Sequence, residues 1–425
     1  MNWRRVLQLA LVHVGVSITV VPVTSTLNRV MIADMGMSAL WVSILVSAPY
    51  LLSPLQVWVG NWADRYPVGG RHRSPWIVLG GLMASFGSYL TAHAVYLLEA
   101  QPGWGVLAAL GSFTLWGVGV NVASVSYLSL LSDLTHDATG WRSRTVSWMW
   151  TAMILSTIAT ALGMAALLDP FSEQALYNAF GLVWMIASVL VLVGAGGLEP
   201  PAAGRRVRHS ADHPLDAYRA LAGNPSARRF FVYLLLVLLS IHAQDVMLEP
   251  YGADVLGMPV AQTTRLASIW GVGVFMTLLG GLPVVRRFGK KRSANWGAAV
   301  VVAAFGGIIV TGLAGLPTAF MAAVWVLGLG GGLMTVSNLS FMIDMTVPEA
   351  AGLYMGAWGV ANFAGQALGN IISGLVRDVV LRLTQAPAAG YIAVFGIEIA
   401  GLIAAVWLFR RISVEEFQRD AQVQL

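Results

Sequence analysis

Cysteine is absent from this chain of 425 residues, and charged residues make up only 11% of it. Without cysteine the chain forms no disulfide, and cysteine usage says nothing about the redox compartment. The shortage of charge argues against a soluble protein, because a folded domain of this length needs a large charged surface in water. Hydrophobic residues instead make up 57% of the chain.

Apolar runs too long for the core helix of a soluble domain recur along the whole chain. A helix that crosses a ~30 Å hydrocarbon core needs roughly 20 apolar residues. The runs do not alternate polar and apolar residues as the strands of a membrane barrel do, so helices are the expected spanning element. We predict an all-α integral membrane protein with twelve spans, at residues 6–33, 38–62, 75–98, 105–132, 144–168, 175–198, 229–253, 260–284, 294–314, 317–343, 352–381 and 390–410.

Lysine and arginine are concentrated in alternate loops between these spans. The first apolar run is too long for a signal peptide, so we interpret it as a retained span. With a cytoplasmic amino terminus, the other side of the membrane has only Arg29, Arg265, Arg377 and Arg382, and all other predicted loop arginines and lysines are cytoplasmic. This asymmetry follows the positive-inside rule and predicts that both termini are cytoplasmic. It also accounts for the net charge of +5 without a nucleic-acid partner.

The two halves of the chain repeat each other. Leu115–Thr135 aligns with Val326–Thr346 without a gap, and the alignment matches Asp133 with Asp344. The repeat predicts a six-span half at 1–198, a basic cytoplasmic linker at 199–228 and a second six-span half at 229–425. Six-span halves related by a pseudo-two-fold axis along the membrane normal are the architecture of the major facilitator superfamily. We therefore expect a twelve-span major facilitator fold.

The loop after span two supports this expectation. Gly60-Asn-Trp-Ala-Asp64-Arg65, followed by Gly69, Gly70 and Arg71, resembles the loop signature of that superfamily, with two extra residues. Asp64 is expected to pair with an arginine or a helix amino terminus, and Arg65 and Arg71 to hold the cytoplasmic side closed. Alternatively, these charges only anchor the loop at the headgroups.

The second half contains the corresponding residues, but Val285 replaces the acid at the position of Asp64. The same gating or structural role is assigned to a set of charged residues at span ends, namely Asp64, Arg65, Arg71, Asp133, Arg142, Arg286 and Asp344.

A few ionisable residues fall inside predicted spans, where a charge is costly and usually faces a cavity or a partner. Arg377, Asp378 and Glu398 belong to this group in spans eleven and twelve. The repeat places Asn28-Arg29 in span one opposite Glu249-Pro250 in span seven. We hypothesise that Arg29 and Glu249 pair across the interface of the halves, as a gate or as a static ion pair.

His242, Asp245 and Glu249 fall at spacings of three and four and share one helix face. A proton relay fits this pattern better than a dedicated metal site, because one histidine and two carboxylates on one helix are an incomplete ligand set. His13 or His242 could also supply an axial ligand to the Mg²⁺ of a tetrapyrrole, although each histidine alone is more often a packing residue.

Glycine and tryptophan clusters have simpler explanations than cofactor binding. Gly328-Leu-Gly330-Gly331-Gly332 lies inside a span with no Gly-Lys-Ser/Thr, so close helix packing explains it better than a nucleotide loop. Most of the 16 tryptophans are expected at the membrane interface. Trp116, Trp270 and Trp358 lie within spans and are candidates for stacking on a flat ligand.

Ser25–Ile32 in span one and Gln244–Gly252 in span seven are specific strings of the sequence. They are similar to the first-span signature and the span-seven motif of the PucC-like, bacteriochlorophyll-delivery family of facilitators. Ser132–Thr135 and Gly352–Gly359 also match, and the resemblance extends over nearly the whole chain. One conservative departure is Ala33-Asp34, where the family pattern has Val-Glu.

The resemblance implies a membrane assembly factor for light-harvesting complexes of photosynthetic bacteria, without enzymatic activity. It implies bacteriochlorophyll or chlorophyll as bound cargo, no nucleotide, and light-harvesting apoproteins and pigment-synthesis enzymes as partners in the bacterial cytoplasmic or photosynthetic membrane. The expected pigment-binding or cavity-lining residues are Asn28, Arg29, His242, Gln244, Asp245, Glu249, Tyr251 and Trp358.

Two other functions compete with this one. The first is a secondary transporter of a small amphipathic solute, proton-coupled through Asp245 or Glu249. The second is a pigment-modifying enzyme, which is the weakest because the sequence shows no catalytic constellation.

Overall fold

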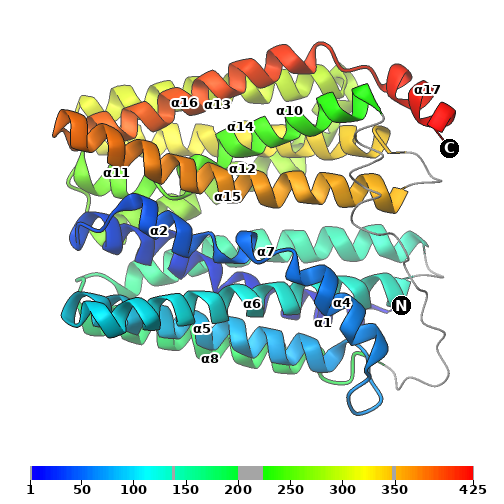
Figure 1. Ribbon diagram of the computed structural model, residues 1–425, viewed down its shortest axis with the longest axis horizontal. Coiled ribbons are helices and arrows are strands. Elements are labelled where there is room, and N and C mark those ends of the chain that lie inside the picture. Colours follow the sequence, from blue (N-terminus) through cyan, green and yellow to red (C-terminus); the bar gives the residue numbers. More distant parts are fainter. Residues whose placement is uncertain (1, 136–138, 200–223, 347–350, 425) are drawn as a thin grey trace. The chain divides into compact units, whose positions relative to one another are not determined.

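The structure is a computed structural model that describes residues 2–135, 139–199, 224–346 and 351–424. Helices make up almost all of these residues, and no strand occurs within them beyond an isolated bridge between Val68 and Arg71 (Figure 1). The expectation of an all-α protein is therefore confirmed. Most of the predicted linker, at 200–223, lies outside the described residues.

The first half of the chain begins with a helix that changes character along its length. The elements are α1 (Trp3–Ser17), π-helical η1 (Pro22–Leu27) and η2 (Val30–Asp34), α2 (Ala39–Val46), α3 (Ala48–Leu51), α4 (Leu55–Arg65), α5 (Ser74–Ala100), α6 (Pro102–Thr135), α7 (Thr139–Leu167) and α8 (Glu173–Ala195). Span two is divided into three pieces, with Pro49 in α3 and Pro54 immediately before α4. Proline lacks the backbone N–H and its ring clashes with the carbonyl of residue i−4, which explains the interruptions.

The second half repeats this order of long helices and adds a helix at the end. The elements are α10 (Pro225–His242), the 3₁₀ turn η3 (Ala243–Asp245), α11 (Leu248–Asp254), α12 (Val260–Phe288), α13 (Lys290–Leu313), α14 (Pro317–Asp344), α15 (Ala351–Thr384), α16 (Pro387–Phe409) and α17 (Val414–Gln424). The twelve predicted spans all fall on the helices of the two halves. The sequence analysis missed α17, whose Phe417 is buried and accepts a hydrogen bond from Asn224 through its carbonyl (3.3 Å).

Ten helical segments among the described residues are long and apolar enough to cross a membrane. The predicted spans at 38–62 and 352–381, which fall on α2–α4 and on α15, are not among the ten. The chain is thus a multi-pass membrane protein.

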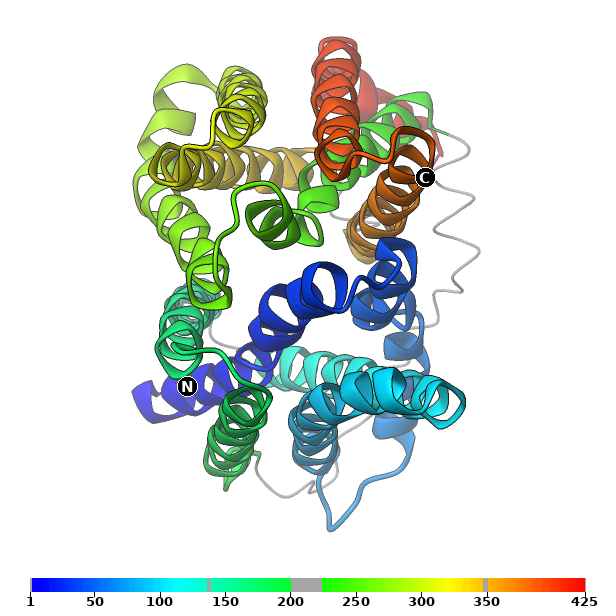
Figure 2. The same ribbon diagram turned by 90° about the vertical axis from the view of Figure 1, so that its left-hand side faces the viewer.

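The chain forms two compact units, each of which Figure 2 shows as a bundle of helices seen nearly end-on. The first unit comprises Met1–Met37, Ile44–Arg208 and Met258–Ser268, and the second comprises Ser38–Ser43, His209–Gly257 and Ile269–Leu425. The units follow the predicted halves over most of their length. However, each unit also contains a short segment from the other half of the sequence, which the repeat did not indicate.

Glycines bring helices into close contact within each unit. A Cβ atom on Gly119 of α6 would overlap the backbone nitrogen of Ala84 in α5. In the second unit, a Cβ atom on Gly328 of α14 would overlap the carbonyl oxygen of Trp270 in α12. The prediction that Gly328 allows close helix packing is confirmed, and Gly119 allows the same close approach in the first unit.

Candidate functional site

The most polar part of the second unit lies where the seventh span is broken. α10 ends at His242, η3 follows, and a regular helix resumes only at Leu248. Pro250 explains part of the interruption, because its ring would clash with the carbonyl of Val246 in a continuous helix. A break of this kind exposes backbone groups and side chains at membrane depth, which membrane proteins tolerate where the chain is packed in protein or lines a cavity.

His242, Gln244 and Asp245 form a hydrogen-bonded cluster at this break. His242 Nδ1 lies 2.8 Å from Asp245 Oδ2, and Gln244 Nε2 donates to Asp245 Oδ1 at 2.6 Å. The side chains of His242 and Asp245 are 23% and 31% exposed. In a neutral imidazole, an Nδ1–H that donates to the carboxylate leaves the lone pair on Nε2. This geometry prepares Nε2 of His242 to accept a proton or bind a metal.

The other residues predicted for span seven and span eleven are packed more deeply. Glu249 is buried in α11. Tyr251 is fully buried, with its hydroxyl 3.4 Å from the carbonyl oxygens of Ile308 and Ile309. Trp358 is also fully buried and packs edge-on against Phe230, with ring centroids 4.8 Å apart.

Tyr251 and Trp358 are packed in the interior of the second unit, and their predicted cavity-lining role stays a prediction. Trp116, a candidate for stacking on a flat ligand, is packed in the same way in the first unit. It is fully buried, and its indole Nε1 donates to Thr19 Oγ1 at 3.2 Å.

Asn28 and Arg29 lie on the irregular part of span one, and both are buried. Arg29 forms an ion pair with Asp34, and its Nη2 donates to the carbonyl oxygen of Met258 at 3.3 Å. Both partners belong to the first unit. Asp34 was noticed in the sequence only as a departure from a family pattern. The hypothesised pair of Arg29 with Glu249 would join the two units, and it stays a prediction.

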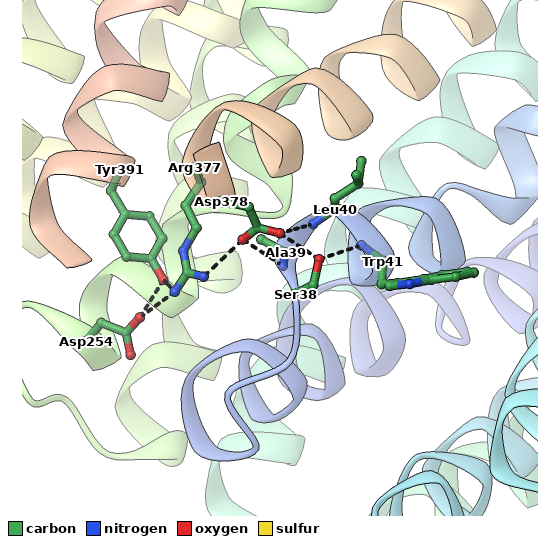
Figure 3. A network of polar contacts seen from close by, with 8 residues as sticks. All are labelled: Ser38, Ala39, Leu40, Trp41, Asp254, Arg377, Asp378 and Tyr391. Atoms are coloured by element: carbon green, nitrogen blue, oxygen red, sulfur yellow. Dashed lines mark hydrogen bonds and ion pairs between the residues drawn. The ribbon is translucent and has the colours of Figure 1, made fainter. Parts of the chain in front are cut away.

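A second polar network of the second unit surrounds Arg377 and Asp378 on α15 (Figure 3). The carboxylate of Asp378 accepts hydrogen bonds from Ser38 Oγ (2.6 Å), Ala39 N (3.1 Å) and Leu40 N (3.1 Å). It thereby caps the amino terminus of α2, whose first N–H groups have no partner within their own helix. We call this set of contacts, with those of Arg377 below, the Arg377–Asp378 network.

Arg377 connects Asp378 to the end of α11. Its Nη1 lies 3.2 Å from Asp378 Oδ1, and its Nη2 lies 3.3 Å from Asp254 Oδ2. The hydroxyl of Tyr391 in α16 also donates to Asp254 Oδ2 at 2.6 Å (Figure 3). Four segments of the second unit are thus held together through two adjacent residues of α15. Sequence analysis singled out Arg377 and Asp378 as charges at membrane depth but did not predict their partners.

The two matched aspartates of the repeat each pair with a basic residue at the start of a neighbouring helix. Asp133 at the end of α6 lies 3.7 Å from Arg73, immediately before α5. Asp344 at the end of α14 lies 2.6 Å from Lys290, the first residue of α13. The structural role assigned to these aspartates thus has a geometric basis in both halves.

Glu199 adds a contact that sequence reasoning missed. Its carboxylate accepts hydrogen bonds from the backbone nitrogens of His72 (2.8 Å), Arg73 (3.0 Å) and Ser74 (2.6 Å), and so caps the start of α5. Arg65, Arg142 and Arg286 are exposed and Arg71 is half-buried. The side chain of Asp64 lies outside the described residues, so its predicted role stays a prediction.

His13, the other predicted Mg²⁺ ligand, is packed within the first unit. Its ring stacks on Tyr127 with centroids 5.1 Å apart, and Trp150 approaches it edge-on at 6.0 Å. The side chain is 7% exposed. Among the residues with described positions, no group of three or more histidines or acids could hold a metal ion.

Comparison with solved structures defines the class of protein. The nucleoside transporter NupG (D323A mutant) superposes with a TM-score of 0.73 over 96% of this chain and 99% of that chain, at 15% identity. At this identity the likeness shows the fold alone. The chain is a membrane protein with a major facilitator fold, as the repeat predicted.

Comparison of sequences defines the family. The profile described as "PUCC protein" matches residues 26–417, nearly the whole chain. Protein PucC of Cereibacter sphaeroides is 31% identical over 93% of this chain and 89% of its own length. The "Bacteriochlorophyll synthase 44.5 kDa chain" of Rhodobacter capsulatus is 28% identical over 96% of this chain and 95% of its own length. The chain belongs to the PucC family.

Proposed function

We propose that this protein is an assembly factor for photosynthetic light-harvesting complexes, which binds bacteriochlorophyll or chlorophyll and delivers it to antenna apoproteins. Membership of the PucC family supports a role in the assembly of photosynthetic complexes. The protein acts in the photosynthetic membrane without catalysing a reaction, and its partners are the apoproteins and the enzymes that supply pigment.

The observation that favours pigment binding is the pair formed by His242 and Asp245. Histidines that bind a metal commonly donate their other N–H to a carboxylate, which orients the ring and increases its basicity. The 2.8 Å contact between His242 Nδ1 and Asp245 Oδ2 has this form, and the His242 side chain is partly exposed. His242 is therefore the better candidate to hold the Mg²⁺ of a bound pigment, because the ring of His13 is enclosed by Tyr127 and Trp150.

The experiment is purification from a phototrophic host, followed by an absorption spectrum of the protein. We expect co-purified pigment in the wild type. Pigment should fall by roughly tenfold or more in His242→Ala and Asp245→Asn, as for the loss of a metal ligand or of its orienting partner. His72→Ala is the matched control. His72 lies between α4 and α5, where its ring bonds the carbonyl oxygen of Ala63, and the variant should retain the pigment.

The alternative is proton-coupled transport of a small amphipathic solute. Absence of pigment from the wild type, together with normal antenna levels in a deletion strain, would contradict the assembly role. Proton-driven uptake of a soluble solute into vesicles would then support the transporter.

A further inference from the structure

The break in span seven is packed tightly by two other helices of the second unit. On α15, a Cβ atom added to Gly369 would lie 2.7 Å from the carbonyl oxygen of Leu239 and 3.2 Å from the backbone nitrogen of Ala243. On α16, a Cβ atom added to Gly401 would overlap the hydroxyl of Ser240. The end of α10 and the start of η3 are thus enclosed by backbone and small side chains.

Three buried polar side chains gather at this enclosed break. Ser240, Gln244 and Glu398 are exposed by 0%, 3% and 1%. Within the part of the chain that the structure describes, the hydroxyl of Ser240, the side-chain oxygen of Gln244 and both carboxyl oxygens of Glu398 form no hydrogen bond of good geometry. The carboxyl group faces the backbone amide of Gln244 and the charge of Asp245. Unsatisfied buried polar groups are rare, so such a group of atoms calls for an explanation.

A small cavity lies beside Glu398. It has about 10 Å³ of space for a water-sized sphere, which is close to the minimum for one water molecule. Apart from Glu398 its lining is apolar except for Ser373, whose hydroxyl donates to the carbonyl oxygen of Asn370. An ionised carboxylate at this place would lose its hydration without gaining a pair, which is costly at membrane depth.

Three cations of the second unit lie over aromatic rings of α16 that are distant from Glu398 along the helix. Arg377 lies over Tyr391, Arg411 over Trp407 and Lys291 over Phe409, and Glu398 lies between the first and the last of these rings. At 1.5 Å per residue the first and the last ring are about 10 Å and about 16 Å from Glu398 along the helix. The elements packed against α16 contain these titratable or charged groups: Arg228, Arg229, Tyr233 and His242 on α10, Asp245 on η3, Glu249, Tyr251 and Asp254 on α11, Lys290, Lys291 and Arg292 on α13, and Arg377, Asp378 and Arg382 on α15.

We propose that Glu398 is a proton-binding site, which exchanges one proton with water and thereby changes the packing of α16 against the broken span. With its proton, the carboxyl group is neutral and fits the apolar surroundings. When the proton leaves to water, the carboxylate accepts a hydrogen bond from the Gln244 backbone N–H, and a shift of α16 brings it a second one from the Ser240 hydroxyl. No other bond forms or breaks. The His242 ring takes no part in this proton exchange.

Infrared difference spectroscopy of the purified full-length protein tests this proposal. Spectra recorded at low and high pH should differ in the carbonyl band of a protonated carboxyl group, and this band should shift in D₂O. Glu398→Gln should remove the band from the difference spectrum, and Glu398→Asp should retain one. Glu173→Gln is the matched control, because Glu173 is exposed at the start of α8, and it should leave the band unchanged.

An identical difference spectrum in the wild type and in a folded, monodisperse Glu398→Gln variant would overturn the proposal. A Glu398 band that neither responds to pH nor shifts in D₂O would also overturn it, because the group would then hold its proton permanently. The pH at which half of the band is lost should be higher in Ser240→Ala, since the carboxylate loses a hydrogen-bond donor. If this pH is unchanged, Ser240 is not that donor. The carboxyl band reports on Glu398 and pigment absorbance reports on His242, so failure of one test leaves the other unaffected.

Discussion

Asp378 shows how much of this fold depends on single polar residues whose partners are distant in the sequence. Its carboxylate caps α2, although Ser38 and Asp378 are 340 positions apart. In the first unit, Glu199 caps α5 from a distance of 125 positions. Both helices begin with N–H groups that have no partner in their own helix, and a carboxylate satisfies them and complements the helix dipole.

The cap predicts a local effect of Asp378→Asn. The amide retains one acceptor but loses the charge, so α2 should lose about 1–2 kcal/mol of local stability. Hydrogen exchange at the amides of residues 39–42 should become roughly tenfold faster. Glu99→Gln, an acid-to-amide change at an exposed position of α5, should not alter exchange in α2. Unchanged exchange in Asp378→Asn would show that the carboxylate does not stabilise the helix.

At the scale of helices, the residues that the two halves share serve helix packing. The candidate binding residues of span seven lie where the halves differ. Asp133 and Asp344 are equivalent in the repeat, and each is paired with a basic residue at the start of the neighbouring helix. Glycines of α6 and α14 likewise allow close approach in both units. In contrast, the break at His242–Asp245 has no 3₁₀ counterpart in span one, whose irregular part is π-helical.

Helix packing predicts a sharp contrast between two glycines of α6. Gly119→Ala should destabilise the first unit by about 1–3 kcal/mol, because the added methyl group overlaps the backbone of α5. Gly111→Ala should have little effect, since nothing lies within 4 Å of a Cβ atom there. Unfolding in mixed micelles with increasing SDS measures both variants. Equal stability of the two would contradict the packing described for Gly119.

The ion pair of Asp344 and Lys290 predicts a modest interaction energy. Both side chains are about one-third exposed, at 35% and 36%. A double-mutant cycle with Asp344→Asn and Lys290→Gln should give a coupling of about 0.2–1 kcal/mol, as for other partly exposed pairs. The same unfolding assay provides the four stabilities. A coupling of zero within error would mean that the contact does not stabilise the folded protein.

At the scale of the whole molecule, the two compact units exchange short segments. Ser38–Ser43 belongs to the second unit and Met258–Ser268 to the first, and the two segments begin one position apart in the repeat. Contacts inside each unit support the exchange. Thr26 Oγ1 lies 3.2 Å from Thr264 Oγ1 in the first unit, and Ser38 bonds Asp378 in the second. Any motion that separates the sequence halves at these positions must break these contacts.

The exchange predicts a crosslink that joins the two halves of the sequence. The chain has no native cysteine, so Thr26→Cys with Thr264→Cys introduces one pair of thiols. Side-chain oxygens 3.2 Å apart place the thiols within reach of a disulfide. An oxidant should produce the crosslink in native membranes, detected after proteolysis by mass spectrometry. Thr26→Cys alone should form no intramolecular crosslink, and a double variant that never crosslinks would contradict the exchange.

The distribution of arginines predicts that the carboxy-terminal helix and the connection between α15 and α16 lie on opposite sides of the membrane. Ser413→Cys, at the start of α17, should react with a membrane-impermeant maleimide only from the cytoplasmic side. Gln385→Cys, between α15 and α16, should react only from the opposite side. Labelling of right-side-out and inside-out vesicles measures both variants. Labelling of both positions from the same side would exclude the predicted topology.

The sequence by itself determined the helical membrane class, the approximate places of the long apolar helices and the family. These depend on apolar run length, on lysine and arginine placement and on the repeat, all of which are local or linear properties of the chain. It also indicated the polar positions of span seven, because charges inside apolar runs are conspicuous. It did not indicate how deeply Tyr251 and Trp358 are packed, since an amphipathic ring suits a cavity wall and a helix interior equally well.

Only the tertiary structure decided the partners of these polar groups. The cap from Asp378 to α2, the contact of Arg29 with Met258 and the enclosure of Glu398 bring together residues that are tens to hundreds of positions apart. Helix periodicity indicates which face a residue occupies but not which other helix packs against that face. Pairing and desolvation depend on that packing, so the environment of each charge was decided by the fold.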